Sequence, residues 1–183
     1  MATRGMGVIY TRTSNGDILR AQPDAETRHS LLDRWYWPHH SQLGHVVNQV
    51  VRRSGVCLIV DCHSFPSVAL PYELDQRGQR ADFCVGTDSF HTPSFVRDAI
   101  IAAVKEAGYS VAVNVPFAGA LVPVASYHKD RRIRSVMIEI NRGIYMNEHS
   151  GVARQEFARV RSTVGRLIVT AAEAAKLAAD GPR

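Results

Sequence analysis

Acidic and imidazole side chains lie in or directly after two apolar stretches of this chain. The formation of an apolar strand does not require such polar side chains. Asp61 and His63 follow the apolar run at residues 56–60, and Glu139 lies inside the run at residues 136–140. A carboxylate in an apolar strand has to be paired, bound to a metal or shifted in pKa, and such groups are enriched at catalytic sites. The residue types therefore predict a catalytic or metal-binding site.

Further polar residues follow the same and neighbouring apolar stretches. Asn114 and the loop containing Gly119 come after one run, while Asn141 and Arg142 directly follow Glu139. Ligands of open α/β sheets gather at the carboxyl ends of the strands, so these residues would line one cleft if the strands are parallel. Arg142 is also the obvious internal partner of Glu139, and a plain buried ion pair is the alternative.

The histidines also have structural alternatives. A single histidine after a strand, such as His63, is more often a hydrogen-bonded structural residue than a metal ligand. Alternation along a strand places Asp61 and His63 on one face, so Asp61 could orient the imidazole or ligate directly. His40 lies on an amphipathic segment beside three aromatic residues, and core, surface and site roles all remain open for it.

Periodicity indicates the elements that must position these residues. Apolar residues at helical spacing predict helices over 23–54, kinked or split at Pro38, over 92–107 and over 150–179. Short apolar runs predict strands at 56–60, 82–86, 109–115 and 136–140. Residues 1–22 lack a steady period and contain the turn former Asn15-Gly16, which indicates an irregular arm with a short hairpin. Helices alternating with buried strands indicate an α/β fold, with residues 1–183 as a single domain.

Composition narrows the class of protein further. The 183 residues are 45 % hydrophobic and 21 % charged, which is typical of a soluble globular chain and not of a disordered or fibrous one. The net charge of +5 is spread along the chain, so we do not expect a nucleic-acid partner. Three cysteines without a CxxC pair and no long apolar segment lead us to expect a reduced, cytoplasmic protein without a membrane span.

At these strand ends the sequence resembles the N-formylglutamate amidohydrolase family. The matching stretches are WYWPHH at 35–40, DCHSFP at 61–66, GTD at 86–88, NVPFAGA at 114–120 and IEINRGIYM at 138–146. They run in the order of the family over nearly the whole chain. The resemblance implies a three-layer α/β sandwich similar to zinc carboxypeptidases, with a mixed, mostly parallel sheet between helices. It also implies hydrolysis of the formyl amide of N-formylglutamate, or of a related N-acyl amino acid, with a divalent metal that is usually zinc.

Transferred to this sequence, the resemblance implies a role for each candidate. His63 would be a metal ligand, and Glu139 the general base that takes a proton from metal-bound water. Arg142 and Asn141 would hold the substrate carboxylate or the developing oxyanion. Asn114 and the Gly119 loop would shape the pocket, with Asp61 and His40 as supporting or additional ligands.

The chain departs from the family pattern at its start. Members usually carry an earlier histidine-rich motif and a later acidic segment, which resemble the source of the other metal ligands. Residues 1–22 contain no histidine, and Asp17 is their only acid. We therefore expect either a member shortened at the N-terminus, with weakened metal binding and weak or no hydrolase activity, or a gene start that was placed too late. The alternative is a non-catalytic relative that binds a small carboxylate or associates with a second copy of itself through a surface left uncovered.

Overall fold

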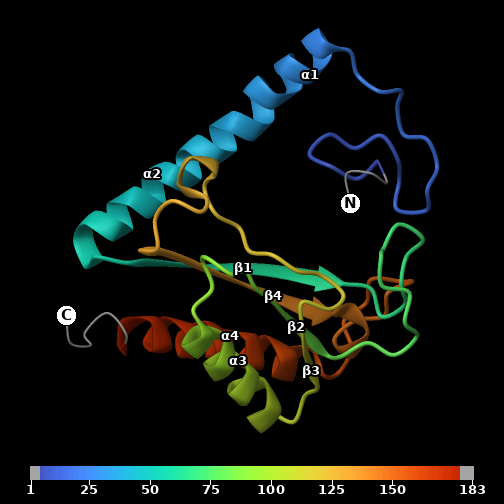
Figure 1. Cartoon of the computed structure of the whole chain (residues 1–183). Helices are drawn as coiled ribbons and strands as arrows, with labels where there is room; N and C mark the ends of the chain where they lie inside the picture. Colours follow the sequence, from blue (N-terminus) through green and yellow to red (C-terminus); the bar gives the residue numbers. More distant parts are fainter. Residues whose placement is uncertain (1–4, 178–183) are drawn as a thin grey trace.

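The fold is a mixed four-stranded sheet with helices on both faces, as the computed structural model shows (Figure 1). The structure describes residues 5–177. The strands lie in the order β1-β4-β2-β3. Their bounds are Cys57–Phe65 for β1, Phe83–Gly86 for β2, Val111–Val113 for β3 and Ile133–Asn141 for β4. The α/β sandwich that the resemblance implies is confirmed.

The sheet contains two pairs of parallel strands that run in opposite directions. β1 is parallel to β4 and β2 is parallel to β3, but β2 and β4 are antiparallel. The carboxyl ends of β1 and β4 therefore meet at one end of the sheet, whereas β3 ends toward the other. We expected the carboxyl ends of three parallel strands to line one cleft, but only β1 and β4 end at the same side of the sheet.

Two strands are longer than their apolar runs predict. β1 continues through Asp61 and His63 to Phe65, and β4 begins three residues before the predicted start and ends at Asn141. β1 lies at one end of the strand order, where polar side chains in its second half can remain in contact with water. Asp61 and His63 are therefore held within a strand rather than in the loop after it.

The first helical stretch contains an irregular turn just before Pro38, where the sequence predicts a kink or a split. α1 spans Ala25–Leu31 and α2 spans Trp37–Ser54, with a π-helical turn over Leu32–Tyr36 between them. Proline lacks an N–H group and its ring crowds the preceding turn, so a widened turn before it relieves the conflict. α2 ends at Gly55, whose φ of 74° suits glycine.

The two later helices pack against the opposite face of the sheet. α3 spans Ser94–Glu106 and α4 spans Phe157–Leu177. The predicted start of the last helix at residue 150 is wrong, because the Asn147 side chain accepts hydrogen bonds from the N–H groups of residues 149 and 150 and holds a turn there. Residues 178–179 of that predicted helix lie outside the described residues.

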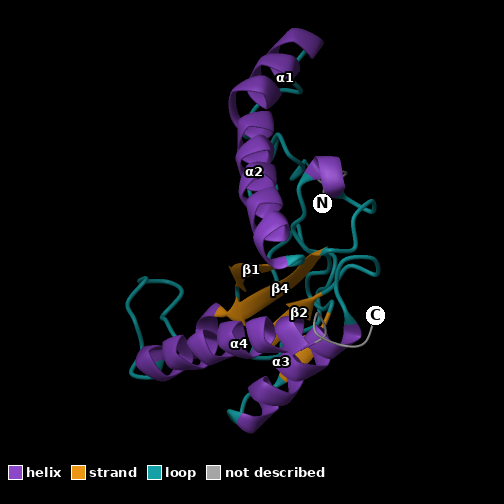
Figure 2. Ribbon diagram, turned by 90° about the vertical axis from the view of Figure 1, so that its left-hand side faces the viewer, coloured by secondary structure: helices purple, strands orange, loops and turns teal. Residues whose placement is uncertain are grey.

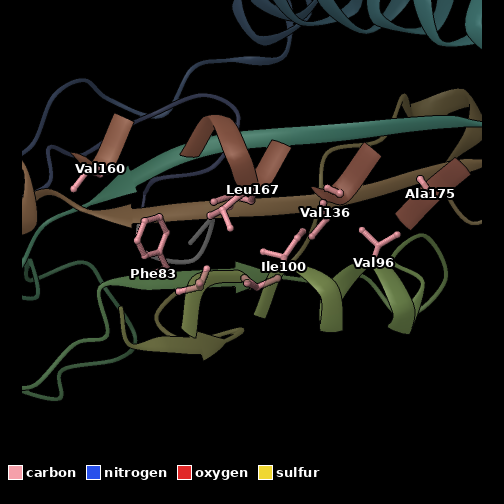
Figure 3. Packing of buried hydrophobic residues seen from close by; sticks show 11 residues of the cluster. Phe83, Val96, Ile100, Val136, Val160, Leu167 and Ala175 are labelled. Atoms are coloured by element: carbon pink, nitrogen blue, oxygen red, sulfur yellow. The ribbon is translucent and has the colours of Figure 1, made fainter. Parts of the chain in front are cut away.

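Most of the core lies between the sheet and the α3–α4 layer. Buried side chains from β2, β4, α3 and α4 interdigitate there (Figure 3): Phe83, Val96, Ile100, Val136, Val160, Leu167 and Ala175. On the other face, Val47 and Val51 of α2 cover only the start of β1 and β4, against Cys57 and Ile133.

The part of that sheet face that α2 leaves uncovered carries the polar side chains of β1 and β4. The α1–α2 rod rises away from it on the side opposite α3 and α4 (Figure 2). On this face, loops rather than helices therefore lie around the second halves of β1 and β4. No helix within residues 5–177 is long and apolar enough to cross a membrane.

Candidate functional site

Register and alternation bring His63 and Glu139 together. They are paired across the parallel strands β1 and β4, and paired residues of neighbouring strands project to the same face of a sheet. Val136 and Ile138 pack against the α3–α4 layer, so Glu139 projects to the face that α2 leaves open. The proximity of the two groups, expected from the resemblance, is present in the fold.

Asp61 orients the histidine. The Nε2 atom of His63 lies 2.8 Å from Oδ1 of Asp61, two residues earlier on the same strand face. The imidazole is 52 % exposed whereas Asp61 is 20 % exposed, so His63 is supported on one side and accessible to a ligand on the other. A carboxylate bound to one ring nitrogen fixes both the tautomer and the orientation of the ring.

Glu139 is a buried carboxyl group with an unused oxygen. The residue is 6 % exposed, and its Oε2 atom is buried without a hydrogen-bond partner. Burial raises the pKa of Glu139, with His63 and Arg142 opposing this shift and Asp61 and Glu73 adding to it. A carboxyl group with a raised pKa and a free oxygen is suited to accept a proton from water or substrate.

Arg142 lies beside this carboxyl group without neutralising it. No ion pair joins Glu139 and Arg142 in the described part of the chain, although the charge of Arg142 acts to lower the pKa of Glu139. The Nε atom of Arg142 is also buried and has no partner. The plain ion pair is therefore not formed, and two unsatisfied polar groups of opposite charge face the same region.

Asn141 and Asn114 are occupied by the backbone and by a neighbouring loop. The Oδ1 atom of Asn141 accepts a hydrogen bond from the N–H of Gly143, and its Nδ2 donates to the carbonyl of Ala81. Asn114, at a φ of 59°, exchanges two hydrogen bonds of 2.8 Å with Thr87 and so connects the loops after β2 and β3.

The loop after β3 returns across the sheet to the site. The carbonyl of Gly119 lies so close to Gly86 that a side chain at position 86 could not fit, which lets this loop lie against β2. The Cys84 thiol bonds the carbonyl of Phe117, and Cys84 is paired with Glu139 in the sheet. Phe117 also packs edge-on against Phe65 at the end of β1. The loop thus provides an apolar wall near Glu139, through Phe117.

Sequence reasoning missed the contribution of residues 66–82. Glu73 and Arg80 form a buried ion pair there, and Glu73 influences the charge of Glu139. A cavity of about 560 Å³ lies between Leu74, Asp75 and Arg77 of this loop and residues 114–118. The length of this irregular segment could have indicated its role in the site, because a loop of this size is uncommon in a compact domain unless it is functional.

The donor atoms do not complete a metal site among residues 5–177. No group of three His, Cys, Asp or Glu residues there could hold a metal ion. Asp61 and His63 supply two donors, whereas a catalytic zinc is normally held by three protein ligands. The Nδ1 atom of His40 is buried and unpartnered, but no hydrogen bond or ion pair joins His40 to His63 in the described chain. A complete zinc site is therefore not formed by these residues.

The fold and the site together define the class of this protein. It is an α/β sandwich with a cluster of polar side chains at the carboxyl ends of two parallel strands. The sequence model of the family described as N-formylglutamate amidohydrolase matches residues 1–146, which include every candidate site residue. The chain belongs to the N-formylglutamate amidohydrolase family. A comparison with curated proteins gives no match.

Two solved structures share the fold of this chain. The chain is similar to an N-formylglutamate amidohydrolase from Ralstonia eutropha, with 26 % identity and a TM-score of 0.69 over 94 % of this chain. A gene product from Agrobacterium tumefaciens shares the fold at 21 % identity, with a TM-score of 0.64 over 89 % of this chain. The chain spans 62 % and 61 % of the lengths of these two proteins.

Proposed function

We propose that this protein hydrolyses the amide bond of N-formylglutamate or a closely related N-acyl amino acid. The observation that carries the proposal is the buried, unpartnered Oε2 atom of Glu139, which faces His63 across paired strands. Membership of the N-formylglutamate amidohydrolase family supports the reaction class.

Each charged residue has a role that its position supports. Glu139 acts as the general base that removes a proton from the attacking water, because its raised pKa brings it closer to neutral pH. Arg142 binds a substrate carboxylate, since its planar guanidinium can bond both oxygens and its Nε is unused. His63, oriented by Asp61, lies where it can hold the amide oxygen or donate a proton to the leaving nitrogen.

The incomplete donor set favours a second candidate function. With two donors among the described residues, the protein would bind zinc weakly and would serve as a non-catalytic module for small carboxylates. Arg142 and the accessible imidazole of His63 are the groups that such a module requires.

Formate release separates the two functions. Purified protein is incubated with N-formylglutamate, with and without added zinc, and formate is measured by a coupled dehydrogenase assay. We expect turnover by the wild type and a loss of about 10² to 10⁴-fold in Glu139→Gln. Absence of formate under both conditions, together with calorimetric binding of glutarate, would support the module instead.

A further inference from the structure

The loop after β3, residues 114–119, is fixed at both ends to Thr87, which follows β2. The side chain of Asn114 exchanges two hydrogen bonds of 2.8 Å with Thr87. At the other end of the loop, the N–H of Gly119 donates to the carbonyl of Thr87 at 3.2 Å. Because both ends bond to one residue, the part of the loop between them, which includes Phe117, is held in place.

Phe117 reaches across β4 from β2 to β1. Its carbonyl accepts a hydrogen bond from the Cys84 thiol of β2 at 3.3 Å, and the centre of its ring lies 6.4 Å from that of Phe65 on β1. β4 lies between these two strands. Cys84 is paired with Glu139, and Phe65 is paired with Asn141, two residues further along β4. Paired and alternate residues share one face of a sheet, so Phe117 crosses β4 on the face that carries Glu139.

The position of Phe117 matches the way exposure changes across the sheet. His63, Glu139 and Cys84 form one row of paired residues on β1, β4 and β2. The imidazole of His63 is 52 % exposed, Glu139 is 6 % exposed and Cys84 is fully buried. The site is therefore open at His63, on the edge strand, and closed by Phe117 toward β2. The burial of Glu139 also raises its pKa, because the charged form loses contact with water.

The cavity of about 560 Å³ lies behind this aromatic ring. It is lined by residues 114–118 and by three residues of the loop between β1 and β2. Phe117 belongs to this lining, whereas His63 and Glu139 do not. The volume lies within the usual range of ligand pockets, about 300 to 1,000 Å³. Phe117 therefore separates Glu139 from a space that is large enough for a ligand group.

The chemistry of the proposed reaction brings the acyl group of the substrate against this ring. Water activated by Glu139 attacks the carbonyl carbon of the amide, so this carbon has to lie beside Glu139. In a formyl amide the carbon carries only a hydrogen atom, whereas it carries a methyl group in an acetyl amide and a propyl chain in a butyryl amide. Since Phe117 covers Glu139, a carbon substituent at this position would meet the ring.

We propose that Phe117 is a specificity-determining residue of this site: its ring leaves room for a formyl group at Glu139 and excludes longer acyl chains from the cavity behind it. This inference rests on the proposed function and names the N-acyl groups that the site accepts. Apolar pockets discriminate between ligands that differ by one methylene group by about 10 to 200-fold.

The kcat/KM values for N-formyl-, N-acetyl- and N-butyrylglutamate test the inference. Glutamate, the product common to all three substrates, is measured by a coupled dehydrogenase assay. We expect the wild type to prefer the formyl substrate, and Phe117→Ala to raise the ratio of butyryl to formyl kcat/KM by about tenfold or more. Phe117→Leu, which keeps a smaller apolar side chain, should raise the ratio of acetyl to formyl kcat/KM and serves if the alanine variant does not fold.

Phe95→Ala is the matched control for the loss of a partly exposed phenylalanine. Phe95 is 39 % exposed and lies on α3, on the opposite face of the sheet, where the guanidinium of Arg134 lies over its ring. This variant should leave the substrate ratios unchanged. Ratios that neither variant of Phe117 changes, or a wild type that hydrolyses the butyryl substrate as fast as the formyl substrate, would overturn the inference.

Calorimetric titration tests the inference without turnover. Glu139→Gln removes the proposed base and keeps the shape of its side chain, so the ligands remain intact during the measurement. In this background, Phe117→Ala should tighten the binding of N-butyrylglutamate by about tenfold and leave the binding of N-formylglutamate nearly unchanged.

The outcomes distinguish this inference from the proposed function. Hydrolysis of N-formylglutamate with an unchanged acyl preference in Phe117→Ala would overturn the role of Phe117 and leave the hydrolase intact. Tighter binding of N-butyrylglutamate, without release of glutamate by the wild type, would support the role of Phe117 and reject the hydrolase. Absence of N-butyrylglutamate binding to the variant that combines Glu139→Gln with Phe117→Ala would overturn the inference.

Discussion

Replacing Glu139 by glutamine should stabilise the protein and should also lower the proposed release of formate by about 10² to 10⁴-fold. Glutamine has the shape of glutamate without the charge, and Glu139 is 6 % exposed with its Oε2 atom unpartnered. Because burial raises its pKa, the folded state holds the proton more tightly than the unfolded state. Stability is therefore lost as pH rises through the pKa of the folded state, and the glutamine variant escapes this loss.

The magnitude follows from linkage. Each unit by which burial raises the pKa lowers the free energy of unfolding above that pKa by about 1.4 kcal/mol. A gain of about 1 kcal/mol in Glu139→Gln would raise the Tm by about 2 to 4 °C in a chain of this size. The gain should be present at pH 8 and should disappear near pH 4, where both states of the wild type are protonated.

Differential scanning calorimetry of wild type and Glu139→Gln at both pH values measures the effect. Glu173→Gln is the control, because Glu173 is exposed on α4 and neutralising it should leave the Tm nearly unchanged. A Glu139→Gln variant that is less stable than the wild type at pH 8 would refute the reasoning, because the carboxylate would then be stabilised by its surroundings.

Three further substitutions test other parts of the structure. Arg142→Lys keeps the charge but loses the bidentate fork, so we expect KM for N-formylglutamate to rise about tenfold with kcat nearly unchanged; an unchanged KM would exclude a carboxylate contact. Leu167→Ala removes a fully buried core side chain and should cost about 2 to 5 kcal/mol in urea unfolding, whereas a loss below about 1 kcal/mol would contradict the packing. Burial acts to raise the pKa of Asp88, but hydrogen bonds, led by that from His128, lower it to about 2. Asp88→Asn should therefore cost about 1 to 2 kcal/mol at pH 7, and the cost should fade as pH drops below about 4; a cost that persists unchanged at pH 2 would rule out this charge effect.

The face that His63 and Glu139 each occupy on its own strand was predictable from local rules, whereas their pairing depends on β1 and β4 being parallel neighbours. Alternation along a strand decides which face each residue occupies, and both residues belong to the strands that proved to be parallel neighbours. The helices and their order also followed from spacing, and Pro38 indicated where the first helical stretch becomes irregular. The hairpin of the arm was predictable from Asn15-Gly16, which lies between the bridged residues Arg12 and Ile18.

The parts that sequence did not predict depend on distant contacts. The direction of β3 relative to β1 is determined by how the sheet assembles, and no residue near Asn114 encodes it. The Glu73–Arg80 pair belongs to a loop whose polar composition is typical of solvent exposure, so its burial became visible only in three dimensions. α4 begins later than predicted because hydrogen bonds to the Asn147 side chain hold a turn before it, and hydrophobic periodicity does not indicate such hydrogen bonds.

The pH dependence of formate release tests the central claim most directly, since it reports the ionisation of the group that removes the proton from water. The kcat/KM for N-formylglutamate is measured from pH 4 to pH 8. We predict that activity rises through a single ionisation on the acid side, at a pKa above the usual 4.5 of a glutamate because Glu139 is buried. An acid limb at or below 4.5, or activity that is independent of pH, would contradict the assignment of buried Glu139 as the base.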